Sequence, residues 1–91
     1  MTEREDIIEQ IATLEAERAA LLSTEQPLHE QFMASPPGSD EEREIGWALD
    51  RLCRRIDQIR DAVGSLKHRL YEIDARISRR EQIRNAAYRG P

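Results

Sequence analysis

The fold is decided by residues 45–77, which read IGWALDRLCRRIDQIRDAVGSLKHRLYEIDARI. Aliphatic side chains recur through this stretch in alternating steps of four and three residues. The ten positions are Ile45, Leu49, Leu52, Ile56, Ile59, Val63, Leu66, Leu70, Ile73 and Ile77. An average step of about 3.5 residues is the repeat of a left-handed coiled coil, in which a narrow apolar face packs against a partner helix. The stretch therefore predicts one long helix with an apolar seam.

The composition agrees with long helices and disagrees with a broad globular core. Leu, Ile, Val and Phe together make up about a fifth of the 91 residues, which is too little for such a core. Ala, Glu, Lys, Leu and Arg make up close to half, as in coiled coils. We expect an all-α chain.

A short turn divides the chain into two helices. Two prolines and a glycine in Ala34-Ser35-Pro36-Pro37-Gly38 end one helix, and Ser39-Asp40-Glu41-Glu42 begins the next as a capping box. The expected elements are a helix over about 3–33, a turn over 34–38 and a helix over about 40–88. Because the connection is short, the two helices are expected to pack antiparallel as a single hairpin domain over 1–91.

The first helix repeats the seam less regularly. Ile7, Leu14, Leu21 and Leu28 occupy one core position of each heptad, and Ile11, Arg18, Glu25 and Phe32 occupy the other. We expect Arg18 and Glu25 to pair, either along the helix or across the seam. Pro27 follows Ser23 and Thr24, which resemble a helix cap, so a kink or a short break is expected there.

The two helices differ in length, and this difference predicts self-association. If Phe32 lies near Ile45 across the turn, Ile7 lies near Leu70, and the second helix continues for another fifteen to twenty residues, roughly 25 Å. A two-helix hairpin of this size rarely holds together alone. We expect a homodimer forming a four-helix bundle or coiled coil, although a different protein supplying the missing helix fits equally well. The expected self-association seam is Leu66, Leu70, Ile73, Ile77 and Ile83.

The charge distribution favours protein partners over nucleic acid. Residues 1–50 carry thirteen acids and three bases, and residues 51–91 carry five acids and eleven bases, whereas a nucleic-acid binder is more often basic overall. The arginines near the C-terminus are Arg76, Arg79, Arg80, Arg84 and Arg89. We expect Arg76, Arg79 and Arg80 to face the acidic first helix of a neighbouring protomer. The alternatives are contact with phosphates, as in helical basic regions, and contact with another acidic protein.

Few residues suggest chemistry. Cys53 is the only cysteine, and His29 and His68 have no metal-ligand spacing, so we expect no catalytic site, metal, cofactor or small-molecule substrate. Trp47, on the outward face of the long helix, and Tyr71 are candidate partner anchors. For Trp47 the alternative is packing over the turn onto Phe32 and Met33.

The sequence as a whole predicts a non-enzymatic coiled-coil interaction protein, such as a small adaptor, assembly factor or regulator. The alternative is a nucleic-acid-associated accessory protein that uses the arginine-rich helix end. The acidic N-terminus and the lack of a long apolar run predict neither a signal peptide nor a membrane span, so a cytoplasmic location is expected.

Overall fold

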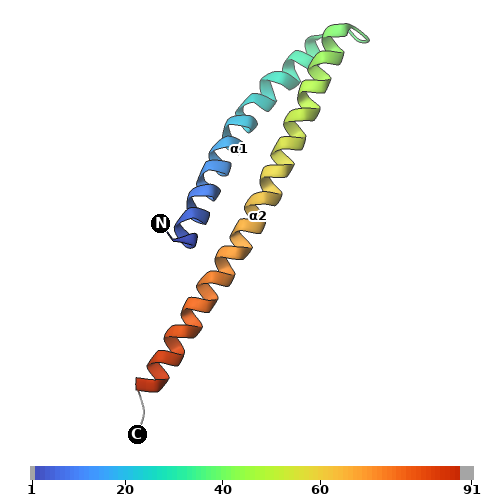
Figure 1. Ribbon diagram of the computed structural model, residues 1–91. Coiled ribbons are helices and arrows are strands. Elements are labelled where there is room, and N and C mark those ends of the chain that lie inside the picture. The colour runs from blue at the N-terminus through green and yellow to red at the C-terminus, as the bar shows by residue number, and fades with distance from the viewer. Residues whose placement is uncertain (1, 89–91) are drawn as a thin grey trace.

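The computed structural model describes residues 2–88, with side chains through residue 86, and consists of two long helices. Helix α1 spans Glu3–Ala34 and helix α2 spans Asp40–Tyr88. They pack antiparallel as an extended hairpin of 81 × 19 × 16 Å (Figure 1). The predicted all-α antiparallel hairpin is confirmed.

Helix α1 begins and ends with side chains that satisfy its free backbone groups. The Thr2 hydroxyl accepts a hydrogen bond from the amide of Glu5 at 3.2 Å, which caps the N-terminus. At the other end, Ser35 is buried, and its hydroxyl and amide both donate to the carbonyl of Gln31, at 2.8 Å and 3.1 Å. The helix therefore extends through Ala34, which had been expected in the turn.

The turn has the geometry of a type II turn followed at once by a helix cap. The amide of Ser39 donates to the carbonyl of Pro36 at 3.1 Å, and Gly38 adopts a positive φ of 76°, which only glycine takes without strain. The Ser39 hydroxyl then accepts from the amide of Glu42 at 3.1 Å. The carboxylate of Glu42 reaches back to the amide of Gly38 at 3.4 Å rather than to that of Ser39, because the Ser39 amide is already used in the turn.

The core is a single seam between the helices. Its buried members are Ile7, Leu49, Leu52, Ile59 and Val63, and Ile59 alone is fully buried. Near the turn the Phe32 ring packs over Gly46, at 3.5 Å from the place where a Cβ atom would stand, which is an ordinary van der Waals distance. A seam this narrow leaves the side chains on either side of it partly open to water.

Pro27 does not break α1. The helix continues through it without interruption, so the predicted break is wrong, and Figure 1 shows α1 curving toward α2 as it approaches the turn. One turn before the proline, the hydroxyls of Ser23 and Thr24 both donate to the carbonyl of Ala20, at 2.7 Å and 3.1 Å. Such back-bonded hydroxyls and a proline are recognised causes of helix bending. These two residues therefore act inside the helix and do not cap it.

The expected pairing of Arg18 with Glu25 is also not present. Glu25 lies 3.6 Å from His29 on the same helix, and Arg18 forms no ion pair with any residue that the structure describes. Arg18 instead borders a shallow hollow beside Val63 and Gly64 on α2. Both charges sit at the open margin of the thin seam, where water solvates them and does not force them together.

Helix α2 continues well beyond α1. The last ion pair between them in this direction joins Arg4 to Asp74, whose atoms Nε and Oδ1 lie 2.8 Å apart. Residues 75–88, hereafter the overhang, extend about 21 Å farther at 1.5 Å per residue. Figure 1 shows this segment with no helix beside it. Neither described helix is apolar over enough of its length to cross a bilayer.

Candidate interaction surface at the open end of the hairpin

Four ion pairs join the helices along the two flanks of the seam. Arg55 donates two hydrogen bonds to the carboxylate of Glu17, at 2.8 Å and 2.9 Å. The others are Arg69 with Glu3, Arg4 with Asp74, and Lys67 with Glu15 at 3.4 Å. All eight side chains keep substantial contact with water, so each pair is screened and adds little to the stability of the fold.

The strongest of these pairs alters the titration of both partners. The hydrogen bonds from Arg55 lower the pKa of Glu17, partial desolvation acts in the opposite direction, and the positive charge of Arg55 lowers the pKa further. The same hydrogen bonds and the charge of Glu17 raise the pKa of Arg55. This is the signature of a bidentate pair of arginine and carboxylate.

The arginines on one flank of α2 recur at heptad spacing and continue beyond the last acid of α1 that could pair with them. Arg55 pairs with Glu17, and two heptads farther along, Arg69 pairs with Glu3, which lies two heptads back on α1. The next heptad brings Arg76, but α1 has ended. Arg76 forms an ion pair with none of the described residues. The flank whose arginines pair with acids of α1 thus continues into the overhang, where no acid of α1 lies opposite it.

One seam residue, Ile77, lies past the end of α1, and Ile83 follows it on the flank that carries Arg76. Ile73 is half-buried, but Ile77 is 46% exposed and Ile83 is 65% exposed, whereas Ile59 in the same helix is fully buried. An open hollow of about 300 Å³ lies at the junction. It is lined by Glu3, Ile73, Arg76, Ile77 and Arg80. The open end therefore presents a basic and apolar helix face that α1 leaves uncovered.

The predicted seam residues divide into two groups. Leu66 and Leu70 are half-buried and lie within the stretch of α2 that is paired with α1. Leu66 directly precedes Lys67, and Leu70 lies between Lys67 and Asp74, both of which form ion pairs with α1. Ile77 and Ile83 lie beyond α1, and Ile73 lies at the boundary. Only the outer part of the predicted seam is free for another chain.

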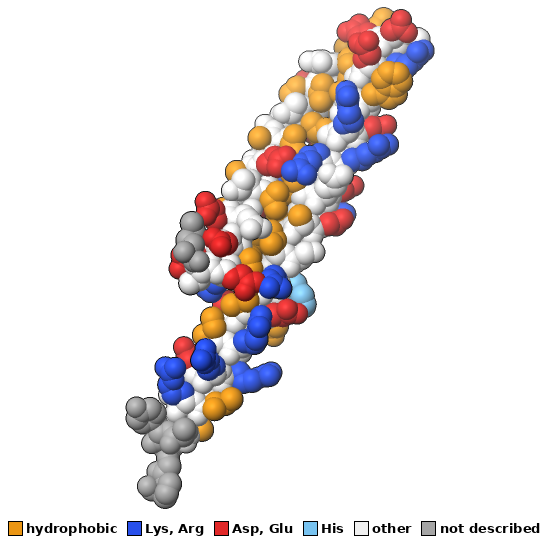
Figure 2. All heavy atoms as spheres, in the orientation of Figure 1, with side chains coloured by type: hydrophobic (Ala, Val, Ile, Leu, Met, Phe, Trp, Pro, Cys, Tyr) orange, Lys and Arg blue, Asp and Glu red, His pale blue; other side chains and the backbone are white. Residues whose placement is uncertain are grey.

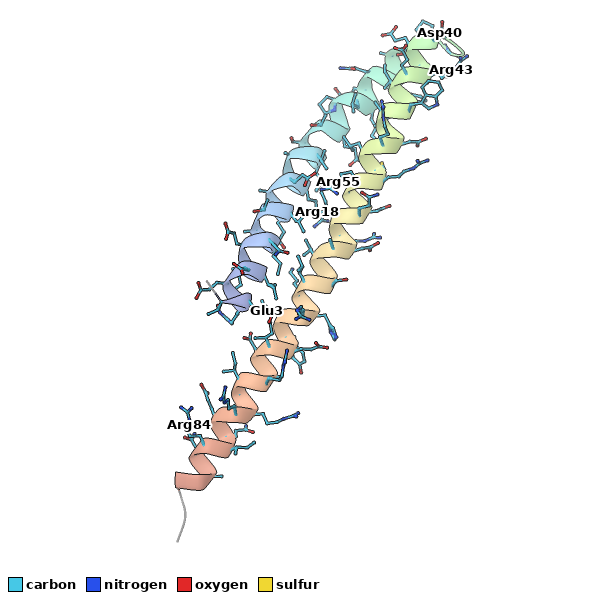
Figure 3. The ribbon with its side chains drawn as sticks, viewed as in Figure 1. Glu3, Arg18, Asp40, Arg43, Arg55 and Arg84 are labelled. Carbon is cyan, nitrogen blue, oxygen red and sulfur yellow. The ribbon has the colours of Figure 1, made fainter. Side chains whose placement is uncertain are left out.

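The remaining arginines are spread around the overhang. Arg79, Arg80 and Arg84 are exposed and, like Arg76, form no ion pair within the described part of the chain. Figure 3 shows Arg84 projecting from the overhang, far from α1, with Glu3 at the end of the paired region. Arg89 lies outside the described residues.

The two candidate aromatic anchors are both exposed. Trp47 is 59% exposed, and it borders a shallow hollow beside the turn together with Phe32 and Gly46. Met33 is 80% exposed and is not part of that hollow, so Trp47 does not cover it. Tyr71 is 72% exposed on α2.

The residues with reactive or metal-binding side chains lie apart from one another. Cys53 is a free, exposed thiol. His29 contacts Glu25, and His68 contacts Glu72 at 3.0 Å, each pair lying within one helix. Among the described residues, no three His, Cys, Asp or Glu side chains gather as metal ligands.

Sequence reasoning missed the residues that flank the seam. Glu17 and Arg55 make the best-formed ion pair of the hairpin, yet neither was singled out. The signal was present, because each lies directly before a core position of its heptad, where charged residues pair between helices. Extending the heptad pattern to the flanking positions would have found both.

No protein-family model matches this chain, no curated protein matches its sequence significantly, and no solved structure matches its fold significantly.

Proposed function

We propose that this protein is a non-enzymatic interaction protein that works by packing helix against helix, and that it self-associates as a homodimer. The observation that carries the proposal is the overhang, in which the exposed Ile77 and Ile83 and several arginines lie past the end of α1. A helix face with this pattern is typical of a coiled-coil contact. The overhang is the part of the molecule that another helix would complete.

Energetics supports a partner at this position. Burying an exposed isoleucine contributes about 2 kcal/mol when the whole side chain is covered, so covering Ile77 and Ile83 contributes about half to two thirds of that each. A helix end with a single apolar stripe and no tertiary contacts is marginal in water. Association would therefore stabilise the overhang as a helix as well as bury its apolar side chains.

Nucleic-acid binding is the second candidate, and one observation favours it. Arg76, Arg79, Arg80 and Arg84 surround the overhang, are exposed, and are engaged by no acid of the described chain. They would be available to phosphates. Against this, the chain carries a net charge of −4, and the acids of α1 lie next to the overhang and would repel a long duplex.

Sedimentation equilibrium over a range of micromolar concentrations tests the proposal. We expect a dimer that Ile77→Asp dissociates, because a charge would be desolvated in the contact. Gln82→Asp is the matched control, since it places the same charge on an exposed position of the same segment. A stable helical monomer at all concentrations would overturn the proposed self-association.

A parallel measurement separates the two candidates. Fluorescence anisotropy with mixed-sequence duplex and single-stranded DNA at low salt is expected to show no micromolar binding. Binding that disappears in Arg79→Ala/Arg80→Ala, together with a steep fall of affinity as salt rises, would favour the nucleic-acid function instead.

A further inference from the structure

The open end of the hairpin carries two surfaces of opposite charge. One is the overhang, with Arg76, Arg80 and Arg84. The other is the first part of α1, where some acids form ion pairs with α2 and others do not. Glu3, Glu15 and Glu17 pair with bases of α2. The acids that form no ion pair with a described residue are Glu5, Asp6 and Glu9, hereafter the acidic end of α1. Figure 2 shows the acids gathered there and the arginines gathered along the overhang.

Each surface also carries exposed apolar side chains. Ile8 lies among the acids and is 42% exposed. A separate open hollow of about 460 Å³ on α1 is lined by Asp6, Glu9, Gln10, Thr13 and Leu14. On the overhang, Ile77 and Ile83 are exposed. The two surfaces therefore offer each other both opposite charge and apolar area.

These surfaces cannot meet within one molecule. The overhang runs away from the N-terminus of α1 in the same straight helix, so its arginines move farther from the acids with each turn (Figure 1). Contact between them requires a second copy of the chain.

Pairing of one overhang with the other along their seam faces is disfavoured. The alternating steps of the seam, continued beyond Ile77, fall on Arg80 and Arg84. Two overhangs packed face to face would bring the arginines of both copies into one contact, and like charges placed together in an interface are strongly unfavourable. The face that continues the seam is suited to an acidic surface instead.

We infer that the overhang of each copy docks on the acidic end of α1 of a second copy. The inference rests on the proposed self-association and adds the surfaces that meet. Both surfaces lie at the same end of the molecule, so one two-fold axis forms both contacts at once. Each overhang then becomes a third helix beside the first turns of the other hairpin. Its length of about 21 Å spans about fourteen residues of α1, which include Glu5, Ile8 and Glu9.

Charge reversal tests the inference with two double variants. The overhang variant is Arg80→Glu/Arg84→Glu, and the α1 variant is Glu5→Arg/Glu9→Arg. Within each variant alone, both symmetric contacts join like charges. In an equimolar mixture, the acidic overhang meets the basic α1 in one contact, and the native basic overhang meets the native acidic α1 in the other. Mixing therefore restores both contacts in a heterodimer.

We expect each variant alone to dimerise at least about tenfold more weakly than the native chain, and the mixture to return to within a few-fold of it. Native mass spectrometry with one variant tagged measures the heterodimer directly. Glu41→Arg/Glu44→Arg, at exposed positions near the turn, is the matched control and should dimerise normally. Circular dichroism confirms that each variant is helical. If charge reversal prevents α1 from folding, Glu5→Gln/Glu9→Gln replaces the α1 variant, and the expected result is then weaker dimerisation of that variant alone, without rescue by mixing.

The outcomes separate the inference from the proposed function. A native chain that stays monomeric overturns the self-association itself. A native dimer whose overhang variant dimerises equally well, or whose variants are not rescued by mixing, overturns the docking arrangement and leaves the self-association standing. Weakening of each variant together with rescue in the mixture supports the arrangement.

Discussion

Two isoleucines of one helix provide an internal comparison of covered and uncovered seam. Ile59 is fully buried and Ile77 is 46% exposed, and alanine removes the same three carbons from each. At about 0.8 kcal/mol per methylene, the transfer loss at Ile59 is about 2.4 kcal/mol, and the cavity left behind raises the cost to about 3 kcal/mol. For Ile77 in an isolated hairpin, about half of the transfer loss applies and no cavity forms, which gives roughly 1 kcal/mol.

Dimerisation raises the cost of Ile77→Ala and leaves the cost of Ile59→Ala unchanged. If a second copy covers Ile77, the cost of Ile77→Ala rises toward about 2 to 3 kcal/mol at concentrations where the dimer forms, because the rest of the side chain is then desolvated. Urea denaturation followed by circular dichroism, at a low and a high protein concentration, measures both costs. Costs for Ile77→Ala that stay near 1 kcal/mol in a demonstrated dimer would refute the assignment of this residue to the interface.

Four further substitutions test the local structure, three by thermal denaturation and one by the pH dependence of stability. Gly38→Ala should destabilise the hairpin by about 1 kcal/mol, because Gly38 has a positive φ. Gly64→Ala should stabilise it by up to about 1 kcal/mol, because Gly64 lies in a helix with open space at its Cβ position. Stability changes of the same sign in both variants would contradict this reasoning. Ser39→Ala should cost about 1 kcal/mol through loss of the α2 cap, and an unchanged midpoint would argue against the cap. The pKa of Glu17 is lowered in the folded state, so its contribution to stability is present above its unfolded pKa and is lost as the pH falls through its folded pKa. The native chain should therefore lose more stability on acidification than Glu17→Gln. Equal losses would show that the pair with Arg55 does not form in solution.

The hairpin was predictable because its determinants are local and repeat along the chain. Ten aliphatic residues in one phase specify α2, and Pro36, Pro37 and Gly38 allow only a turn between it and α1. Ser39 and Glu42 specify where α2 begins. Each of these signals points to the same structure, so the architecture could be read without knowledge of any tertiary contact.

The errors arose where the outcome depends on the other helix or on solvent. Arg18 and Glu25 were expected to pair because they share a core position, but the seam is thin enough for water to solvate both. Of the kink or break expected at Pro27, the break is wrong, and the packing of Leu28 and Phe32 beside α2 favours continuing the helix past the proline. Which acids of α1 are engaged and which are free depends on the register between the helices, so composition alone could not separate Glu3 from Glu5.

The position of the turn gives the proposed dimer a definite form. Both docking surfaces lie at the open end of the hairpin, so the two turns point away from each other at the opposite extremities. Two rods of 81 Å that overlap by about 40 Å make a particle roughly 120 Å long. In this arrangement each extremity would display an identical Trp47 beside its turn, and the proposed dimer would be a spacer that holds two equivalent surfaces at a fixed separation.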